Sequence, residues 1–317
     1  KTPAQGKRCM RCHAPLAEQK ALVARELGWD SAPAGPVPDY VPEDLHRQGL
    51  VCAGCHVRRH RRYGPPAERR LVEGEAGPHN GFREVSAFQD SRFCASCHQF
   101  PPDGPSLAGK LRENTFREWQ ASAYAERGVS CQDCHMPEGR HSWRGIHDPG
   151  MVREAVSVDL AVERGPQGQG RARARVTNSG AGHHFPTYLT PAVTARLVLE
   201  DGQGREQREI ARHVIAWKAD VEMTRELFDT RLPAGESALL VGGFPWPEQP
   251  GWEVVLRLRV APQAHYERLF RYMLRQQDKM DDETQRLLHR ALEEARATRF
   301  AALEQRRPLE PAPPPGP

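Results

Sequence analysis

Every cysteine in this sequence belongs to one repeated pattern that is suited to binding a cofactor. The pattern Cys-x-x-Cys-His occurs four times, as CMRCH, CAGCH, CASCH and CQDCH. Its residues are Cys9, Cys12 and His13; Cys52, Cys55 and His56; Cys94, Cys97 and His98; and Cys131, Cys134 and His135. In this pattern the two thiols bond to the edge of a haem and the His binds its iron from one face. The sequence therefore predicts four covalently bound haem c groups.

Paired cysteines have two other common uses, structural zinc sites and disulfide frameworks. Neither use requires a His directly after every second Cys. Four pairs of identical spacing, each followed by His with no Cys left over, therefore favour haem.

The chemistry of each iron depends on the ligand that binds its second face. The chain has 14 histidines, so ten remain beyond the four in the motifs, enough for a second His at every iron. Methionine ligation is less favoured, because Met10 and Met136 lie within or beside motifs. A six-coordinate iron has no open position for a small molecule. The pattern thus predicts low-spin haems that transfer electrons, and no enzyme activity.

The elements that must position these residues change in character along the chain. Residues 1–152 hold all the cysteines and show little periodic hydrophobic pattern, which indicates an irregular, partly helical domain whose apolar core is largely porphyrin. One helix is readable there. Thr115 and Glu118 have capping-box spacing, and Gly128 marks its end.

Residues 153–261 alternate apolar and polar side chains with period two, as in Ala172, Ala174 and Val176, and this predicts an antiparallel β-sandwich. Residues 262–306 return to helical spacing and predict a helical hairpin. Residues 307–317 are proline-rich and predict an extended tail that acts as a docking strap. The expected fold class is therefore α+β and multidomain.

Charge and hydropathy limit the partners that the protein could bind and the compartment in which it could act. The formal net charge is +4, and the basic run RRHRR after the second motif suits contacts with haem propionates better than nucleic acid, for which no binding motif is present. No apolar run reaches the length of a membrane span. Covalent haem attachment and paired thiols predict a periplasmic or extracellular protein, with Lys1 as the start of a processed chain that has lost its signal peptide.

Longer stretches of the sequence carry a resemblance to a known family. FCASCHQF, ENTFREWQASAYAERGVSCQDCHMP, HSWRGIHDPGMV and VTNSGAGHHFPT resemble the multihaem c-type cytochromes related to the tetrahaem cytochromes of ammonia oxidisers, in the branch with an added β-domain. This resemblance implies closely stacked haems. It also implies second axial ligands at His183, which occupies the family's Gly-His-x-Phe-Pro position, and at His141, His147 and His79. His46 and His60 are held in reserve.

The resemblance leaves several functions open. Some members of this group form extracellular cytochrome filaments, and others donate electrons to a reductase. The expected function is electron transfer with redox partner proteins, either as a filament subunit or as a soluble shuttle. A multihaem reductase of a nitrogen or sulfur oxyanion is the alternative enzyme class; it needs an open iron, and all four motifs here end in His. A tetrahaem donor of the reaction-centre type ranks last, because that family takes methionine ligands from helices ahead of the motifs, and no Met precedes the second, third or fourth motif here at such a distance.

Overall fold

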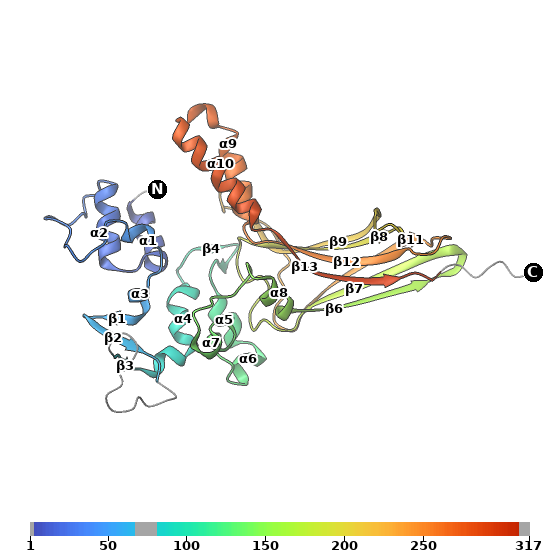
Figure 1. Ribbon diagram of the computed structural model, residues 1–317, viewed down its shortest axis with the longest axis horizontal. Helices are drawn as coiled ribbons and strands as arrows, with labels where there is room; N and C mark the ends of the chain where they lie inside the picture. Colours follow the sequence, from blue (N-terminus) through green and yellow to red (C-terminus); the bar gives the residue numbers. More distant parts are fainter. Residues whose placement is uncertain (1–2, 67–80, 311–317) are drawn as a thin grey trace, which may run out of the picture. The chain divides into compact units, whose positions relative to one another are not determined.

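This computed structural model describes residues 3–66 and 81–310 (Figure 1). His79, Arg69 and Arg70 lie outside the described residues, as do residues 311–317 of the predicted tail. The chain divides into two compact units, Lys1–Cys97 and His98–Pro317. This boundary lies inside the third Cys-x-x-Cys-His motif and not at residue 152, where the sequence analysis placed it.

The first unit consists of short elements joined by long connections, as the lack of hydrophobic periodicity predicts. A buried Gln19 joins two of them, because its Nε2 donates to the carbonyl oxygens of Leu45 at 3.1 Å and Gly49 at 2.7 Å. The elements are α1 Pro3–His13, α2 Ala17–Glu26, η1 Leu45–Arg47, α3 Cys52–His56, β1 Val57–Arg58, β2 Arg61–Gly64, β3 Arg83–Glu84, η3 Ser86–Gln89 and α4 Ser91–His98.

The second unit begins with short helices that contain the fourth motif. Its elements before the sandwich are β4 Ser106–Leu107, β5 Lys110–Leu111, α5 Thr115–Gln120, α6 Ala123–Glu126, α7 Cys131–His135, η4 Pro137–Gly139 and α8 Pro149–Ala155. The single helix expected from Thr115 is two helices. The capping box is also wrong, since Asn114 precedes α5 and the Thr115 hydroxyl donates to Glu113 at 2.6 Å.

Two antiparallel sheets follow and form the predicted sandwich (Figure 1). One has the order β11, β7, β6 and the other β10, β9, β8, β12, β13. The strands are β6 Val156–Arg164, β7 Gln169–Asn178, β8 Ala192–Glu200, β9 Glu206–Ala219, β10 Glu226–Asp229, β11 Ser237–Pro245, β12 Glu253–Ala261 and β13 Phe300–Pro308, with η5 Pro166–Gly168 between β6 and β7.

The core of the sandwich follows from the alternation in the sequence. On β7, Ala172, Ala174 and Val176 are fully buried, while the arginines between them are exposed. Successive side chains on a strand point to opposite faces, so an alternating sequence places one apolar set between the sheets. Val254, Leu256 and other inward residues of the second sheet complete one continuous core.

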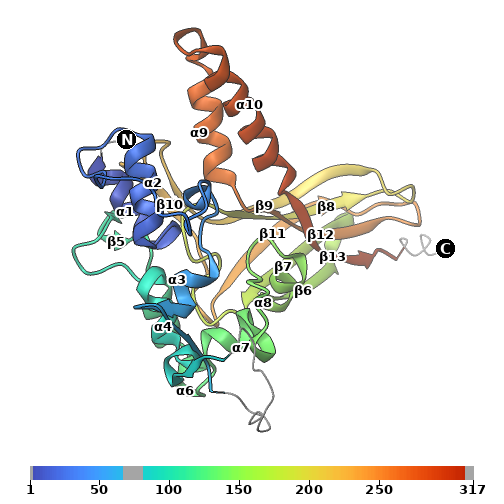
Figure 2. The same cartoon turned by 60° about the vertical axis from the view of Figure 1, so that its left-hand side comes forward.

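The helical hairpin consists of α9 Ala264–Leu274 and α10 Asp282–Ala297, with η6 Gln277–Lys279 between them (Figure 2). It ends earlier than predicted. Residues 300–308 form β13, which pairs with β12 and extends the sheet. The sequence there is rich in helix-forming residues, but hydrogen bonding to the edge of β12 and burial of Ala302 outweigh that propensity. The predicted α+β multidomain class is confirmed.

Candidate haem-binding site

Each Cys-x-x-Cys-His motif forms the end of a helix and finishes it with the His. The helices are α1, α3, α4 and α7. Residues three and four apart lie on one face of a helix. Helical geometry therefore brings the two thiols of each motif to the same side as its imidazole. None of the eight cysteines, all of which lie in the described part of the chain, is in a disulfide, as thioether bonding to haem requires.

Three of the four motif histidines have Nδ1 close to an oxygen atom of the protein. His56 Nδ1 lies 2.8 Å from the Tyr63 carbonyl oxygen, and His135 Nδ1 lies 2.6 Å from the Arg144 carbonyl oxygen. A carbonyl only accepts, so these Nδ1 atoms carry the protons. The proton-free Nε2 is then the nitrogen that binds a metal, which is the usual arrangement of a ligating His.

His98 has a carboxylate instead. Its Nδ1 lies 3.7 Å from Glu113 Oε1, and this contact raises the pKa of His98. His13 is exposed at the end of α1. Three of the four motif histidines thus have an oxygen atom near Nδ1, and two of those oxygens are backbone carbonyls that impose one tautomer.

His183 lies beside the fourth motif. Its ring centre is 6.3 Å from that of His135, and the two ring planes differ by 13°. A metal–imidazole bond is about 2 Å long and the ring centre lies about 1 Å beyond the nitrogen, so two imidazoles on opposite sides of one metal have centres about 6 Å apart. The pair therefore fits the two axial positions of a single iron.

The protonation of His183 also suits a ligand. Its Nδ1 lies 2.9 Å from the carbonyl oxygen of His184, so this nitrogen carries the proton and Nε2 has a free lone pair. Burial lowers the pKa of His183, which favours the neutral imidazole that binds metal.

The loop that holds His183 is anchored at both ends. Phe185 exchanges backbone hydrogen bonds with Leu232 at 2.8 and 3.0 Å, and its ring is buried in the sandwich core. Before the loop, Asn178 is 1% exposed, and its Nδ2 donates to the carbonyl oxygens of His183 at 2.8 Å and Leu232 at 2.9 Å. The sandwich thus positions the imidazole.

Glycine is required within this loop at one position. A Cβ on Gly180 would lie 1.9 Å from the carbonyl oxygen of Glu154 in α8, a separation that atoms do not reach without displacing the backbone. Nearby, a Cβ on Gly182 would lie 3.1 Å from Tyr124 and 3.3 Å from Trp119. The glycines therefore let the loop approach the helices around the fourth motif. Trp119 and Tyr124 pack against this loop.

Glu118 forms a buried polar centre behind His183. Its side chain is 3% exposed, and Oε1 lies 3.1 Å from His184 Nδ1 and 3.5 Å from Arg231. Its Oε2 accepts from the His184 backbone N–H at 3.1 Å and from the Thr187 hydroxyl at 2.7 Å. Burial alone would raise the pKa of Glu118, but these partners outweigh it and the pKa is lowered.

The other predicted second ligands lie in different surroundings. His141 and His147 are exposed, and the His141 ring is 6.0 Å from the ring of Trp143. They flank Arg144, whose carbonyl binds His135, so their segment adjoins the fourth motif. His46 has its Nε2 2.5 Å from Glu26 Oε2, and His60 is exposed in the turn between β1 and β2.

Sequence reasoning missed Asn178 and Glu118. Asn178 had no distinguishing signal at a strand end, and Glu118 was assigned to a helix cap. Their roles depend on contacts across 54 and 69 residues of chain, to Leu232 and Thr187, which no local pattern encodes.

A chain of similar fold is found among solved structures. It is the penta-heme cytochrome c552 from Thermochromatium tepidum, with a TM-score of 0.60 and 18% identity; the alignment covers 95% of this chain and 83% of that one. The protein therefore shares the fold of a multihaem cytochrome. A second structure, the sporulation control protein Spo0M from Bacillus subtilis, aligns over 34% of this chain and 44% of its own with 14% identity and a TM-score of only 0.17, too low to support an argument.

Comparison of the sequence alone is less informative. No protein-family model matches the chain, and no curated protein matches it.

Proposed function

We propose that this protein is a tetrahaem c-type cytochrome that transfers electrons. The observation that carries the proposal is the fourth motif, where His135 and His183 present proton-free Nε2 atoms and have ring centres 6.3 Å apart. Three further motifs repeat the same helix-terminal arrangement. The solved structure of similar fold is itself a penta-heme cytochrome, which supports the same chemistry here. Eight cysteines in four pairs give four haems for this chain.

Cysteines and histidines would hold the cofactors in different ways. The cysteines would form thioether bonds, and His13, His56, His98 and His135 would supply one ligand to each iron. His183 would supply the second ligand of the fourth iron, and His79, His141 and His147 are proposed for the others. When bound, each haem supplies an iron that accepts and releases one electron.

The protein environment would keep this iron chemistry restricted to electron transfer. The carbonyl partners of His56 and His135 fix the tautomer and the direction of each imidazole, so each Nε2 would be held ready to bind a haem iron. An iron held by two histidines, as His135 and His183 would hold one, would transfer electrons and would have no open position for an oxyanion. This arrangement favours a carrier over a multihaem reductase.

The setting follows from the same proposal. A covalently attached haem in an electron carrier implies a periplasmic or extracellular location and redox partner proteins. In the described part of the chain, no helix combines the length and the apolar character needed to cross a bilayer. Self-association into a filament is part of the proposal and is considered at the scale of the whole molecule below.

The haem content tests the proposal directly. A pyridine haemochrome assay combined with intact mass should give four haems per chain, and electron paramagnetic resonance of the oxidised protein should show low-spin iron. Bound zinc, or fewer than four haems, would contradict the tetrahaem assignment. A large high-spin ferric population in native protein would instead favour a reductase.

A further inference from the structure

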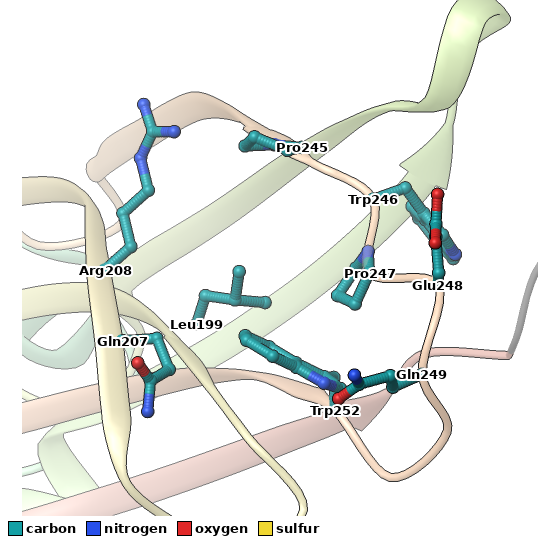
Figure 3. Close-up of a pocket in the computed structure, with 9 residues that line it drawn as sticks. All are labelled: Leu199, Gln207, Arg208, Pro245, Trp246, Pro247, Glu248, Gln249 and Trp252. Carbon is teal, nitrogen blue, oxygen red and sulfur yellow. The ribbon is translucent and has the colours of Figure 1, made fainter.

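Two places in the second unit offer polar groups to a ligand, and they differ in charge. The first is a pocket of about 420 Å³ between the loop that follows β11 and the start of β9 (Figure 3). Its lining includes Arg208 and Glu248, which have opposite charges, and Gln207 and Gln249, which have both donors and acceptors; all four are exposed. These groups favour no single class of ligand.

The second place is a group of buried side chains at the turn between β9 and β10, and it is more selective. His265, at the start of α9, is only 1% exposed, and its Nε2 has no hydrogen-bond partner among the described residues. Arg112 follows β5, and its Nε is likewise buried and unpartnered in this part of the chain. A buried polar atom without a partner is costly and rare, so two of them indicate a site for a bound group.

Both unpartnered atoms are hydrogen-bond donors. Arg268 Nη2 lies 3.1 Å from His265 Nδ1. A guanidinium has no acceptor, so Nδ1 of His265 accepts and its Nε2 carries the proton. The Nε of Arg112 carries a proton as well. His265 thus has the opposite tautomer to His183, and it is suited to donating to an acceptor and not to binding iron.

One turn brings these side chains together. Arg112 Nη2 donates to the Met223 carbonyl oxygen at 2.6 Å, and Arg268 Nη2 donates to the Ala219 carbonyl oxygen at 2.8 Å. Met223 and Ala219 lie in one apolar cluster. Burial lowers the pKa of His265, and the positive charges of Arg268 and Arg112 lower it further. Arg112 therefore lies close enough to His265 for its charge to act on the imidazole.

The acidic side chains of the neighbouring elements have other partners. Asp220, in the turn, accepts from the backbone N–H of Thr224 at 2.8 Å and from its hydroxyl at 2.6 Å. Three more carboxylates are also engaged, since Glu226 and Asp229 bind Lys110 and Glu113 contacts His98. Among the described residues, neither Arg112 nor Arg268 forms an ion pair with a carboxylate. The site therefore combines two uncompensated positive charges with two free donors.

We infer that Arg112 and His265 bind a carboxylate group. Its two oxygens only accept hydrogen bonds, and they match the two free donors, one of them charged. The source that we favour is a haem propionate, and this part of the inference rests on the proposed function. Arg112 directly precedes Glu113, whose Oε1 lies 3.7 Å from Nδ1 of the motif residue His98. A free carboxylate such as acetate is the other source of the same chemistry.

Redox titration of the holoprotein at several pH values tests the propionate source. In Arg112→Gln, we expect the midpoint potential of one haem to fall at about pH 8, because its propionate loses the positive charge that offsets it. The shift should shrink toward about pH 5, where an unpaired propionate takes up a proton. Arg112→Lys keeps the charge and should restore the natural behaviour, which a merely structural role of the guanidinium would not predict.

Arg225→Gln is the matched control, because it removes an exposed arginine from the same turn. It should leave every potential unchanged. His265→Leu should shift the same haem as Arg112→Gln, and His265→Gln, which keeps an N–H donor, should shift it less. A shift of equal size in the Arg225→Gln control would show that the buried site is not the cause, and it would overturn the inference.

Calorimetric titration of the natural holoprotein with acetate distinguishes the two sources and requires no variant to fold. If a propionate fills the site, acetate does not bind and the potential shift is observed. If a free carboxylate is the ligand, acetate binds, and Arg112→Gln weakens binding about tenfold or more. Four low-spin haems with neither a potential shift nor acetate binding would overturn this inference and leave the proposed function intact. A chain without haem that binds acetate would do the reverse.

Discussion

At the scale of the residue, the chemistry of the site depends on which imidazole nitrogen carries the proton. His135 and His183 each have Nδ1 within 2.9 Å of a carbonyl oxygen, so both keep Nε2 free. Neighbouring His184 differs, because its Nδ1 faces the carboxylate of Glu118. The partners of these two adjacent histidines therefore differ: His183 keeps Nε2 available for a metal, and His184 contacts a buried carboxylate.

Replacing His183 with Ala should remove the second ligand of one iron. We expect about a quarter of the haem to become high-spin and to bind carbon monoxide, since one of four irons would lose its sixth bond. His184→Ala is the matched control and should leave the haem low-spin. The measurements are electron paramagnetic resonance of the oxidised protein and carbon monoxide difference spectra of the reduced protein. If H183A stays fully low-spin, His46 or His60 becomes the better assignment.

Replacing Glu118 with Gln should destabilise the second unit. The substitution keeps the shape but removes the charge opposite Arg231, whose side chain is only 5% exposed. Removing one partner of a buried ion pair costs about 3 kcal/mol. Guanidinium unfolding followed by far-ultraviolet circular dichroism should show this loss. Glu126→Gln, an exposed change at the end of α6, should have almost no effect; similar values for both variants would show that Glu118 is not a structural centre.

At the scale of the element, the ends of the strands near the fourth motif are fixed by ion pairs as well as by the core. Asp229 is the last residue of β10 and accepts from Arg231 Nε at 2.9 Å and from Lys110 Nζ at 2.7 Å. Arg231 in turn lies over the ring of Trp217, 4.2 Å from its centre, and donates to the Thr187 carbonyl oxygen. This network joins the β4 and β5 region to the loop after His183.

Asp229 makes the stability of this region depend on pH. Burial raises its pKa, but the Arg231 and Lys110 contacts outweigh burial and lower it from 3.8 to about 2. Because the folded pKa is below the unfolded one, the stabilisation is present above pH 4 and is lost as the pH falls toward 2. Each pKa unit corresponds to about 1.4 kcal/mol, so Asp229→Asn should cost about 2 kcal/mol at neutral pH.

Urea unfolding at a series of pH values between 7 and 2 measures this dependence. The difference in unfolding free energy between the natural chain and D229N should shrink as the pH approaches 2. Asp159→Asn, at an exposed position on β6, provides the control. A difference that is the same at pH 7 and pH 2 would show that the Asp229 charge is not the cause.

At the scale of the whole molecule, the protein combines the region of the Cys-x-x-Cys-His motifs with a β-sandwich and a helical hairpin, which a small electron shuttle would not need. These parts offer surfaces for association between copies. The hairpin leaves Tyr266 41% and Leu287 48% exposed. Its base is fixed to the rest of the unit, because Glu267 binds Arg299 at 2.6 Å and His265 binds the Thr190 backbone at 3.0 Å.

We expect the native protein to polymerise so that haems of successive subunits form a continuous array. Negative-stain electron microscopy of protein purified from its native source should show filaments, and dilution should release subunits with the same haem spectrum. Discrete monomeric particles at every concentration would rule out the filament and leave the soluble carrier.

Much of the fold was predictable because its signals are local. The Cys-x-x-Cys-His pattern predicts haem attachment from five consecutive residues. The period of two in residues 153–261 predicts which side chains face the sandwich core. The Gly-Ala-Gly-His-His-Phe-Pro sequence pointed to His183 through family resemblance, and its setting in the structure agrees with a ligand's requirements. What local propensity could not predict was β13, where residues that favour a helix form a strand.

The sequence by itself determined the four Cys-x-x-Cys-His motifs on which the haem proposal rests, and where the sheet begins. The tertiary structure alone decided that His183 lies beside His135 and His184 beside Glu118, and that Asn178 holds the loop. The physical reason is distance along the chain. Contacts between residues 48 or 66 positions apart, such as His135 with His183 and Glu118 with His184, are selected by the packing of whole elements, which no short pattern records.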